Sequence, residues 1–491
     1  GLGDVYKRQV LGIEHPDTLA SMSSLANSYD ELSRQDEALE MREELLALYR
    51  KILGDEHRET LGGMTNLASS YYDASRQDEA IALYEESLAI KRRVLSPGDQ
   101  FTLVAMSCLA SCYFKVGRLD EALEIREEVL ALSRRIRGAE HPETLGAMGS
   151  LAFSYHASGR LDEALKMREE VLALRRKVSG VEHRDTLGAM TNLAFSYDDA
   201  GRRDEAIALY EESLAIKRRV LSPGDPFTHA AMANLANSYH DAGRLDEALK
   251  MREEVLALSR KTRGDEHPNT LSSMTYLANS YDTAGRRDEA LEMREEVLPL
   301  CRKVLGDEHR DTHVAMANLA NSYHDAGRWD EAIELGEELL PLRRKVLGDE
   351  HLDTLGAMTN LAIFYHDAGR LEEALEIREE VLPLCRKVLG DEHLDTLGAM
   401  GNLANSYQDA GRWDEAIELG EELLALRRKV LGDEHLDTLG AMGNLANSYQ
   451  SSSRLDDAIP MQEDLLALRR KLLGDEHSDT LIAASNLANS Y

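Results

Sequence analysis

The sequence predicts an all-α protein in which helical hairpins stack into a solenoid. A 42-residue period runs along the chain, with its first position at residues 19, 61, 103, 145, 187, 229, 271, 313, 355, 397, 439 and 481. Periods of this length are typical of stacked supersecondary units. Within each period, apolar residues recur at the spacing of two successive amphipathic helices. The unit is clearest in residues 397–438, which read LGAMGNLANSYQDAGRWDEAIELGEELLALRRKVLGDEHLDT.

The first half of the unit predicts an amphipathic helix. Its apolar residues fall on one stripe when they are placed at 100° per residue. They are Leu397, Met400, Leu403, Ala404 and Tyr407. Small and polar residues occupy the opposite face, so we expect the stripe to be buried and the opposite face to be accessible.

The second half predicts another helix, which follows a break at residues 410–412. Asp414 is its candidate N-cap, and Gly432 is suited to end it. Asp437 or Thr438 is the candidate N-cap of the next hairpin. The apolar stripe of this second helix consists of Ala416, Ile417, Leu419, Leu423, Leu424 and Leu426.

The repeats account for the whole domain organisation that the sequence predicts. Residues 1–18 correspond to the partial helix and linker of a truncated preceding repeat, residues 19–480 to eleven full repeats, and residues 481–491 to the first helix of a truncated twelfth. One hairpin buries too little apolar surface to fold alone, so we expect the repeats to stabilise one another through nearest-neighbour contacts. The abrupt ends indicate a fragment of a longer protein.

Composition argues against several classes of partner. Lys and Arg number 57 against 89 Asp and Glu, which leaves a formal charge of −32. This charge opposes binding to nucleic acid and to anionic membranes, so we expect neither as a partner. The chain has no uninterrupted apolar run long enough to span a bilayer. Only 4 Cys occur in 491 residues, which favours a reducing, cytoplasmic location over a disulfide-rich secreted one.

The sequence shows no pattern of residues that is typical of catalysis. Phosphate loops, dinucleotide-binding turns, nucleophile elbows and paired-histidine zinc helices do not occur. Ten of the 16 His lie in the linkers, once per repeat, among them His351, His393 and His435. Equivalent points on successive repeats are at least about 8–10 Å apart, too far to share one metal ion. We therefore expect these histidines to fix the linkers, and we predict no metal, no cofactor and no enzymatic activity.

The hairpin resembles the tetratricopeptide repeat. The likeness is carried by Leu403, Ala404 and Tyr407 of the first helix, then Gly411 and Ala416. The 42-residue length and the linker Leu-Gly-Asp-Glu-His are similar to the kinesin light chain subtype, which also occurs as the sensor array of certain signalling NTPases. The resemblance implies a right-handed superhelix whose first helices line a concave groove.

Asparagines dominate the predicted accessible face of the first helices. A carboxamide both donates and accepts hydrogen bonds, so a ladder of them can pair with the main chain of an extended ligand. Peptide-binding tetratricopeptide domains use an Asn before the Leu in this way, which the resemblance extends to this chain. Alternatively, the ladder is only solvated, or its Asn pairs bridge adjacent first helices. The candidate residues are Asn192, Asn234, Asn237, Asn318, Asn321, Asn360, Asn402, Asn405, Gln408, Asp409, Asn444 and Asn447.

The charge of this face predicts the kind of ligand. Lys115 is the only cation at the groove-facing positions of the first helices, whereas anions such as Asp325, Asp367 and Asp409 recur there. Recognition of acidic peptides needs Lys or Arg at these positions, so we expect a neutral or basic extended ligand. Inward rotation of the second helix would change this expectation, because Arg428 and Lys429 would then form a cationic rim.

The sequence therefore predicts a noncatalytic scaffold that binds a protein or peptide partner in the groove. The alternative is a sensor or oligomerisation array of a larger signalling NTPase. The sequence makes no prediction of oligomeric state.

Overall fold

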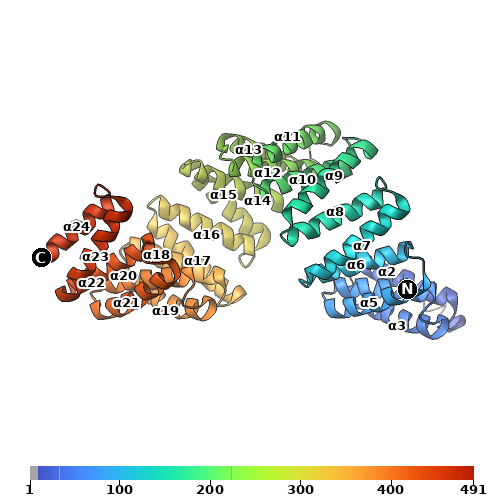
Figure 1. Ribbon diagram of the computed structural model, residues 1–491, viewed down its shortest axis with the longest axis horizontal. Coiled ribbons are helices and arrows are strands. Elements are labelled where there is room, and N and C mark those ends of the chain that lie inside the picture. Colours follow the sequence, from blue (N-terminus) through green and yellow to red (C-terminus); the bar gives the residue numbers. More distant parts are fainter. Residues whose placement is uncertain (1–8, 33, 223) are drawn as a thin grey trace. The chain divides into compact units, whose positions relative to one another are not determined.

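The computed structural model describes residues 9–32, 34–222 and 224–491 (Figure 1). Within these ranges the chain forms 23 α-helices and no β-strand. The helices belong to two compact units, residues 1–243 and residues 244–491. In each unit a helix of about four turns alternates with a slightly longer one, as the repeat predicts. Residues 1–8 of the predicted partial helix lie outside the described residues.

The first unit contains α2 to α12. The even-numbered members are the first helices of the hairpins: α2 (Pro16–Glu31), α4 (Arg58–Asp73), α6 (Gln100–Lys115), α8 (Pro142–Ala157), α10 (Arg184–Asp199) and α12 (Pro226–Asp241). The odd-numbered members are the second helices: α3 (Gln35–Leu53), α5 (Gln77–Val94), α7 (Leu119–Arg137), α9 (Leu161–Ser179) and α11 (Arg203–Val220).

The second unit contains α13 to α24. Its second helices are α13 (Leu245–Arg263), α15 (Arg287–Leu305), α17 (Trp329–Leu347), α19 (Leu371–Leu389), α21 (Trp413–Leu431) and α23 (Leu455–Leu473). Its first helices are α14 (Pro268–Thr283), α16 (Arg310–Asp325), α18 (Leu352–Asp367), α20 (Leu394–Asp409), α22 (Leu436–Ser451) and α24 (Ser478–Ser490).

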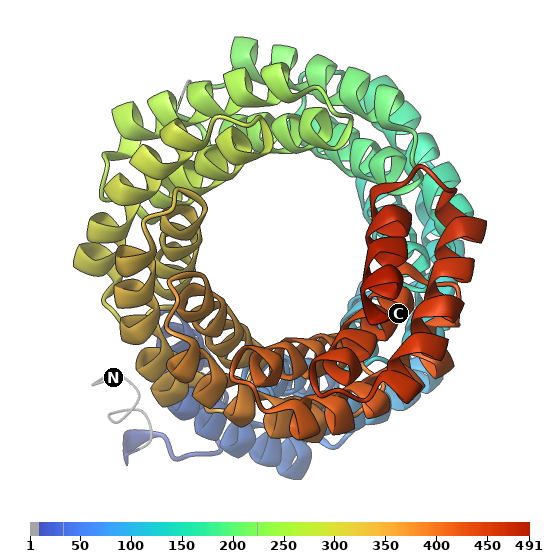
Figure 2. The same ribbon diagram turned by 90° about the vertical axis from the view of Figure 1, so that its left-hand side faces the viewer.

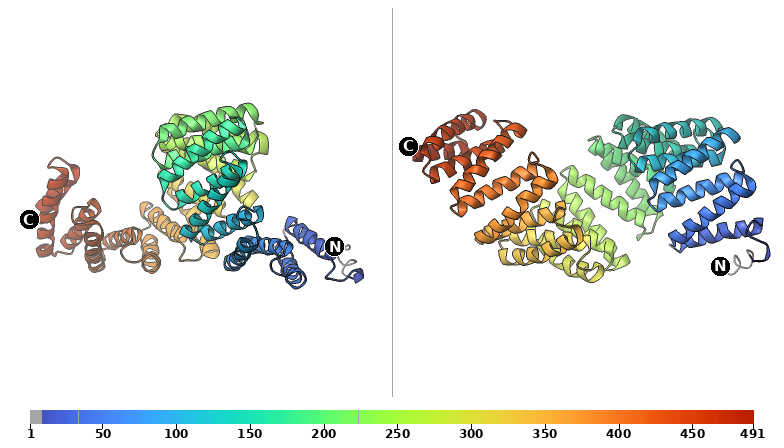
Figure 3. Two further views of the ribbon diagram at one scale, coloured as in Figure 1. Left: turned by 45° about the vertical axis from the view of Figure 1, so that its right-hand side comes forward. Right: turned by 90° about the horizontal axis from the view of Figure 1, so that it is seen from below.

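Within each unit the helices form two layers, with the first helices on the inside of the curve. Successive first helices contact one another; for example, α4 contacts α6 and α20 contacts α22. Figure 2 shows the C-terminal helix α24 in the inner layer. Figure 3 shows the antiparallel hairpins from two further sides. Each unit is thus a helical solenoid, as predicted.

The core follows the predicted stripes. Met358, Met400 and Met442 are between 0% and 1% exposed, and the leucine three residues after each is also buried. In the second unit Met358 belongs to one core cluster, and Met400 and Met442 belong to a second; each cluster spans several hairpins. Each hairpin therefore buries its apolar stripes against its neighbours.

The linkers correct one prediction about helix capping. The N-cap of α22 is His435, whose Nδ1 accepts a hydrogen bond from the backbone N–H of Asp437 at 3.2 Å. Asp437 and Thr438 were predicted for this role. Asp437 instead lies inside the first turn, and the hydroxyl of Thr438 donates back to the carbonyl of Gly432 at 2.8 Å. The linker histidine thus has the structural role that the sequence predicts, by a mechanism that the sequence did not reveal.

The turn inside the hairpin corrects a second prediction. The N-cap of α21 is Arg412, which makes no side-chain capping bond, and Asp414 lies in the first turn. Gly411 adopts a φ of 69°, a left-handed conformation that glycine tolerates best. Ser75 and Ser453 adopt the same conformation in repeats without this glycine. The turn geometry is therefore retained even where it is less favourable.

Candidate peptide-binding face

The predicted asparagines lie on the accessible side of the first helices. We name this surface, taken separately in each unit, the first-helix face. We define it by the twelve candidate residues together with the exposed residues beside them on α10, α12, α16, α18, α20 and α22. All twelve candidates are exposed or half-buried, and none is buried. The helical stripe explains this position, since the Leu and Ala next to each Asn point into the core.

Some of the asparagines hydrogen-bond between successive first helices. The amide nitrogen of Asn360 donates to the side-chain oxygen of Asn321 at 3.3 Å, and Asn444 donates to Asn405 at 2.9 Å. This is the bridging arrangement that was the alternative to ligand binding. Each such bond uses one of two N–H donors of one carboxamide and one of two lone pairs of the other. The bridges therefore orient the carboxamides without exhausting their hydrogen-bonding capacity.

Gln408 is engaged more fully than the asparagines. Its amide nitrogen donates to the Ser448 hydroxyl at 2.6 Å and to the backbone oxygen of Asn444 at 3.0 Å. The side chain is half-buried between α20 and α22. The main role of Gln408 is therefore to link two repeats, which leaves it less available to a ligand.

A chain of histidines and aspartates runs beside the asparagines on α16, α18 and α20. His324 Nε2 lies 2.8 Å from Asp367 Oδ2, and His366 Nε2 lies 3.1 Å from Asp409 Oδ2. The hydrogen bond from His366 holds the pKa of Asp367 below its ordinary value, and His324 adds to the effect. Asp367 thus stays ionised, and this part of the face carries carboxylates paired with titratable partners.

Arginines of the second helices also reach the layer of first helices. The charge predicted from the sequence counted first-helix residues alone and therefore omitted these arginines. Arg42, Arg126, Arg168, Arg252, Arg294 and Arg378 occupy one position of the second helix, and each donates to a serine hydroxyl on the first helix of the next repeat. The sequence contains a signal for this contact, because a repeat with the arginine is followed by a repeat with the serine. Where glycine replaces the arginine at Gly420, Gln408 supplies the donor instead.

These arginines differ in their carboxylate partners. Arg42 and Arg294 form ion pairs with Asp30 and Asp282. At the positions equivalent to these aspartates the sequence has Phe114 and His156. Arg126 lies 5.4 Å from the centre of the Phe114 ring. Burial lowers the pKa of both Arg126 and Arg168 from the ordinary value, although Asp199 offsets part of the effect for Arg168.

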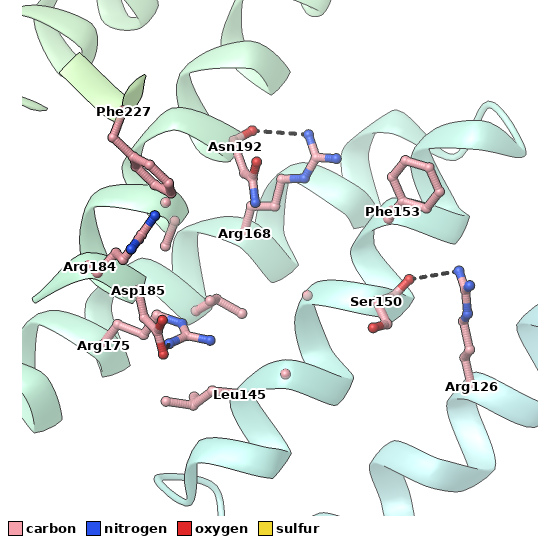
Figure 4. A pocket seen from close by; sticks show the side chains of 15 residues that line it. Arg126, Leu145, Ser150, Phe153, Arg168, Arg175, Arg184, Asp185, Asn192 and Phe227 are labelled. Carbon is pink, nitrogen blue, oxygen red and sulfur yellow. Dashed lines mark hydrogen bonds and ion pairs between the residues drawn. The ribbon is translucent and has the colours of Figure 1, made fainter. Parts of the chain in front are cut away.

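Arg126 and Arg168 line a cavity of about 520 Å³ in the first unit (Figure 4). Figure 4 shows Arg168 beside Asn192, Arg184 near Phe227, and Arg175 near Asp185. Arg168 donates to the backbone oxygen of Asn192 at 3.1 Å. The predicted site residue Asn192 therefore lies at a cationic cavity.

The hairpin-turn arginine joins successive repeats. Arg412 lies 4.4 Å from the centre of the Tyr407 ring and forms ion pairs with Glu379 and Glu415. The equivalent Arg328 lies over Tyr323 and pairs with Glu295 and Glu331. Each cluster joins a turn to the second helix of the preceding repeat. These contacts explain why an arginine recurs at this position in the repeats, and no ligand is needed to account for it.

In the described part of the chain, the cations at the Arg428 and Lys429 positions pair with carboxylates of linkers and second helices. Lys429 bonds to Glu392 of the preceding linker at 2.5 Å, and Arg428 pairs with Asp433. The equivalent Arg386 pairs with Glu422 of the next second helix. These cations therefore link second helices and linkers to one another.

The described residues offer little that is typical of catalytic chemistry. Across residues 9–32, 34–222 and 224–491, histidines, cysteines and carboxylates do not gather in a group that would hold a metal ion. The four cysteines are free thiols. Burial raises the pKa of Cys112 and Cys301 to about 11, which keeps both thiols protonated at neutral pH. Over the same ranges no helix combines the length and apolarity needed to cross a bilayer.

The stacked hairpins define a helical-repeat protein, and comparison with known families identifies which one. A tetratricopeptide repeat model matches residues 36–93, 101–166, 143–219, 228–303, 284–345, 311–366, 353–429, 395–471 and 437–491, and a second such model matches residues 191–259. The chain belongs to the tetratricopeptide repeat family. The resemblance seen in the sequence is confirmed.

Solved structures similar to this chain include kinesin light chain-like proteins. Two crystal structures of a Podosopora anserina kinesin light chain candidate with nearly identical TPR-like repeats share 34% identity, cover 42% of this chain and 96% and 97% of their own, and superpose with a TM-score of 0.40. BtubC (BKLC) from P. vanneervenii shares 21% identity over 48% of this chain and 92% of its own, with a TM-score of 0.39. No curated protein matches the chain.

Proposed function

We propose that the chain is a noncatalytic interaction scaffold that binds an extended, neutral or basic peptide segment of a protein partner along the first-helix face. Tetratricopeptide arrays are protein-interaction scaffolds, which supports the general role. The observation that carries the specific proposal is the accessible ladder of carboxamides on α16, α18, α20 and α22. The alternative role as a sensor array of a larger NTPase stays a prediction.

The ladder suits a main chain better than a particular side chain. Asn321 and Asn360 are fixed to each other, as are Asn405 and Asn444, so little side-chain entropy is lost when a ligand binds. The free donors and acceptors recur on successive helices, and an extended peptide presents N–H and C=O groups at a regular spacing. Binding of this kind tolerates many side chains.

The carboxylates beside the ladder favour a neutral or basic ligand. The side chain of Asp325 is 63% exposed, and those of Asp367 and Asp409 are each 40% exposed. These charges attract a basic peptide and repel an acidic one, and because they are accessible, salt weakens the effect.

The test compares capped neutral, basic and acidic peptides for binding to the full chain. The variant carries Asn318→Ala, Asn321→Ala, Asn402→Ala and Asn405→Ala, all within the second unit. We expect neutral and basic peptides to bind more tightly than acidic ones, and the fourfold variant to weaken binding by at least about tenfold, which corresponds to about 1.4 kcal/mol.

The matched control places uncharged substitutions on the exposed side of the second helices. Pro341→Ala and Pro383→Ala introduce the residue that equivalent positions such as Ala425 already have. We expect this control to bind as the unaltered chain does. Unchanged affinity in the asparagine variant would exclude the first-helix face as the binding surface.

A further inference from the structure

The cavity at Arg126 and Arg168 has a charge opposite to that of the chain. Four arginines and one aspartate line it, a net formal charge of +3, whereas the whole protein carries −32. The single carboxylate, Asp185, is already paired with Arg175 at 2.6 Å. The other three guanidinium groups therefore give the cavity a concentrated positive potential.

Those three groups bond to neutral partners. Arg126 donates to the Ser150 carbonyl at 3.0 Å, and Arg168 donates to the Asn192 carbonyl at 3.1 Å. Arg184 lies 4.1 Å from the centre of the Phe227 ring. A guanidinium group has five N–H donors, so each retains donors for a ligand. Of the three, Arg126 is half-buried and Arg168 is buried. Burial of a cation without an ion-paired carboxylate is costly, and an anionic ligand would reduce that cost.

The cavity is also open enough for a ligand. Gly146, Gly149 and Gly188 face it from α8 and α10, and a Cβ atom placed at any of them would meet no heavy atom within 4 Å. Its volume of about 520 Å³ lies within the usual range of ligand pockets, roughly 300–1,000 Å³. Phe153 and Phe227 add apolar walls (Figure 4).

We propose that this cavity binds a phosphate monoester on an extended peptide, such as a phosphoserine side chain, with Arg126, Arg168 and Arg184 as its ligands. All three guanidinium groups line the same cavity. Charge-assisted hydrogen bonds from guanidinium groups to phosphate oxygens are roughly twice as strong as bonds between neutral partners.

The charge of the cavity distinguishes phosphate from carboxylate. A phosphate monoester carries about −1.5 to −2 at neutral pH and has three acceptor oxygens, so it balances most of the +3 charge. A carboxylate supplies only −1 and two oxygens. Asn192 lines the same cavity, and a carboxamide there suits the main chain that would carry the phosphorylated side chain. This site goes beyond the proposed function and shares none of the substitutions that test it.

The experiment measures binding of short capped alanine peptides to the full chain by calorimetry at low ionic strength. The probes contain one central phosphoserine, serine or aspartate, and inorganic phosphate is measured alongside. The variant Gly188→Glu introduces a carboxylate at a cavity position where an added Cβ atom would meet no heavy atom within 4 Å. Gly398→Glu is its matched control at the equivalent position of α20, which is equally open. The variant Arg184→Gln removes one cation from the cavity. Within the described residues, Arg184 makes no hydrogen bond that joins two repeats.

We expect the phosphoserine peptide to bind at least about tenfold more tightly than the other three probes. Gly188→Glu and Arg184→Gln should each weaken it by about tenfold or more, while Gly398→Glu leaves it unchanged. Equal affinity for the aspartate peptide would overturn the choice of phosphate, and equal affinity for inorganic phosphate would overturn the peptide. Equal weakening by the two glutamate variants would exclude the cavity.

Discussion

A histidine at the end of most linkers determines where the next first helix begins. His435 caps α22 through its Nδ1 atom, and His351 and His393 do the same for α18 and α20. In two linkers an aspartate takes this place, as Asp99 and Asp225 accept from the backbone at 2.9 and 2.8 Å. The position therefore requires a short-range acceptor, not the imidazole itself.

We predict that His435→Ala loosens the start of α22, because a lost N-cap costs about 1 kcal/mol. The measurement is amide hydrogen exchange over residues 436–442, which should accelerate in this variant. His435→Asp should exchange like the unaltered chain, since Asp99 caps α6 in the same way. If the aspartate variant exchanges as fast as the alanine variant, the histidine acts through something other than capping.

The sequence could not identify this cap, because Asp and Thr are stronger N-cap formers than His in general. Asp437 and Thr438 were thus the better candidates on propensity alone. Likewise, an asparagine can be assigned to an accessible face from helical spacing, as Asn402 and Asn405 were, but its hydrogen-bond partner on the next repeat depends on the distance between helices. The bond from Asn444 to Asn405 became visible only in three dimensions.

At the scale of helices, a glycine of α18 and a glycine of α17 have different roles. Gly356 in α18 is exposed, and an added Cβ would meet nothing within 4 Å. Gly336 in α17 is buried, and an added Cβ would lie 2.9 Å from Leu361 Cδ1. The first glycine only weakens its helix, whereas the second allows two repeats to pack closely.

We predict opposite effects of alanine at these two positions. Gly356→Ala should raise the midpoint of thermal unfolding, because alanine stabilises a helix interior by roughly 0.5–1 kcal/mol over glycine. Gly336→Ala should lower it, because Leu361 is only 2% exposed and has little room to move. Gly440→Ala serves as a second open position, with nothing within 4 Å. A rise for Gly336→Ala equal to that for Gly356→Ala would contradict the packing argument.

Helices were the part of the structure that periodicity predicts best, since one 42-residue pattern specifies both stripes and both breaks. Contacts made by long side chains between helices were harder to foresee. Arg168 belongs to a second helix by sequence, yet its guanidinium group bonds to Ser196 on the next first helix. The resulting cationic cavity lies in the same layer that first-helix residues alone had indicated to be acidic.

At the scale of the whole molecule, two electrostatic effects oppose each other. Ion pairs join successive second helices, as Arg302 with Glu338 and Arg344 with Glu380, at 2.7 and 2.6 Å. The net charge of −32 instead produces repulsion over the entire chain. Exposed ion pairs contribute only about 0–1 kcal/mol each, whereas a large net charge destabilises every compact state.

We predict that repulsion dominates, so that the midpoint of thermal unfolding rises as ionic strength increases. The Debye length falls from about 30 Å at 0.01 M to about 8 Å at 0.15 M. Contacts shorter than 3 Å, such as that of Arg344 with Glu380, lose little at the higher salt, while repulsion between distant carboxylates is largely screened. The measurement is thermal unfolding followed by circular dichroism at the two salt concentrations.

A variant with Glu376→Gln and Glu418→Gln tests the same idea, since both residues are exposed on second helices. Its midpoint should rise less with added salt, because its net negative charge is smaller. A midpoint that falls with added salt would mean that the ladder of ion pairs, not the net charge, controls the electrostatic stability of the array.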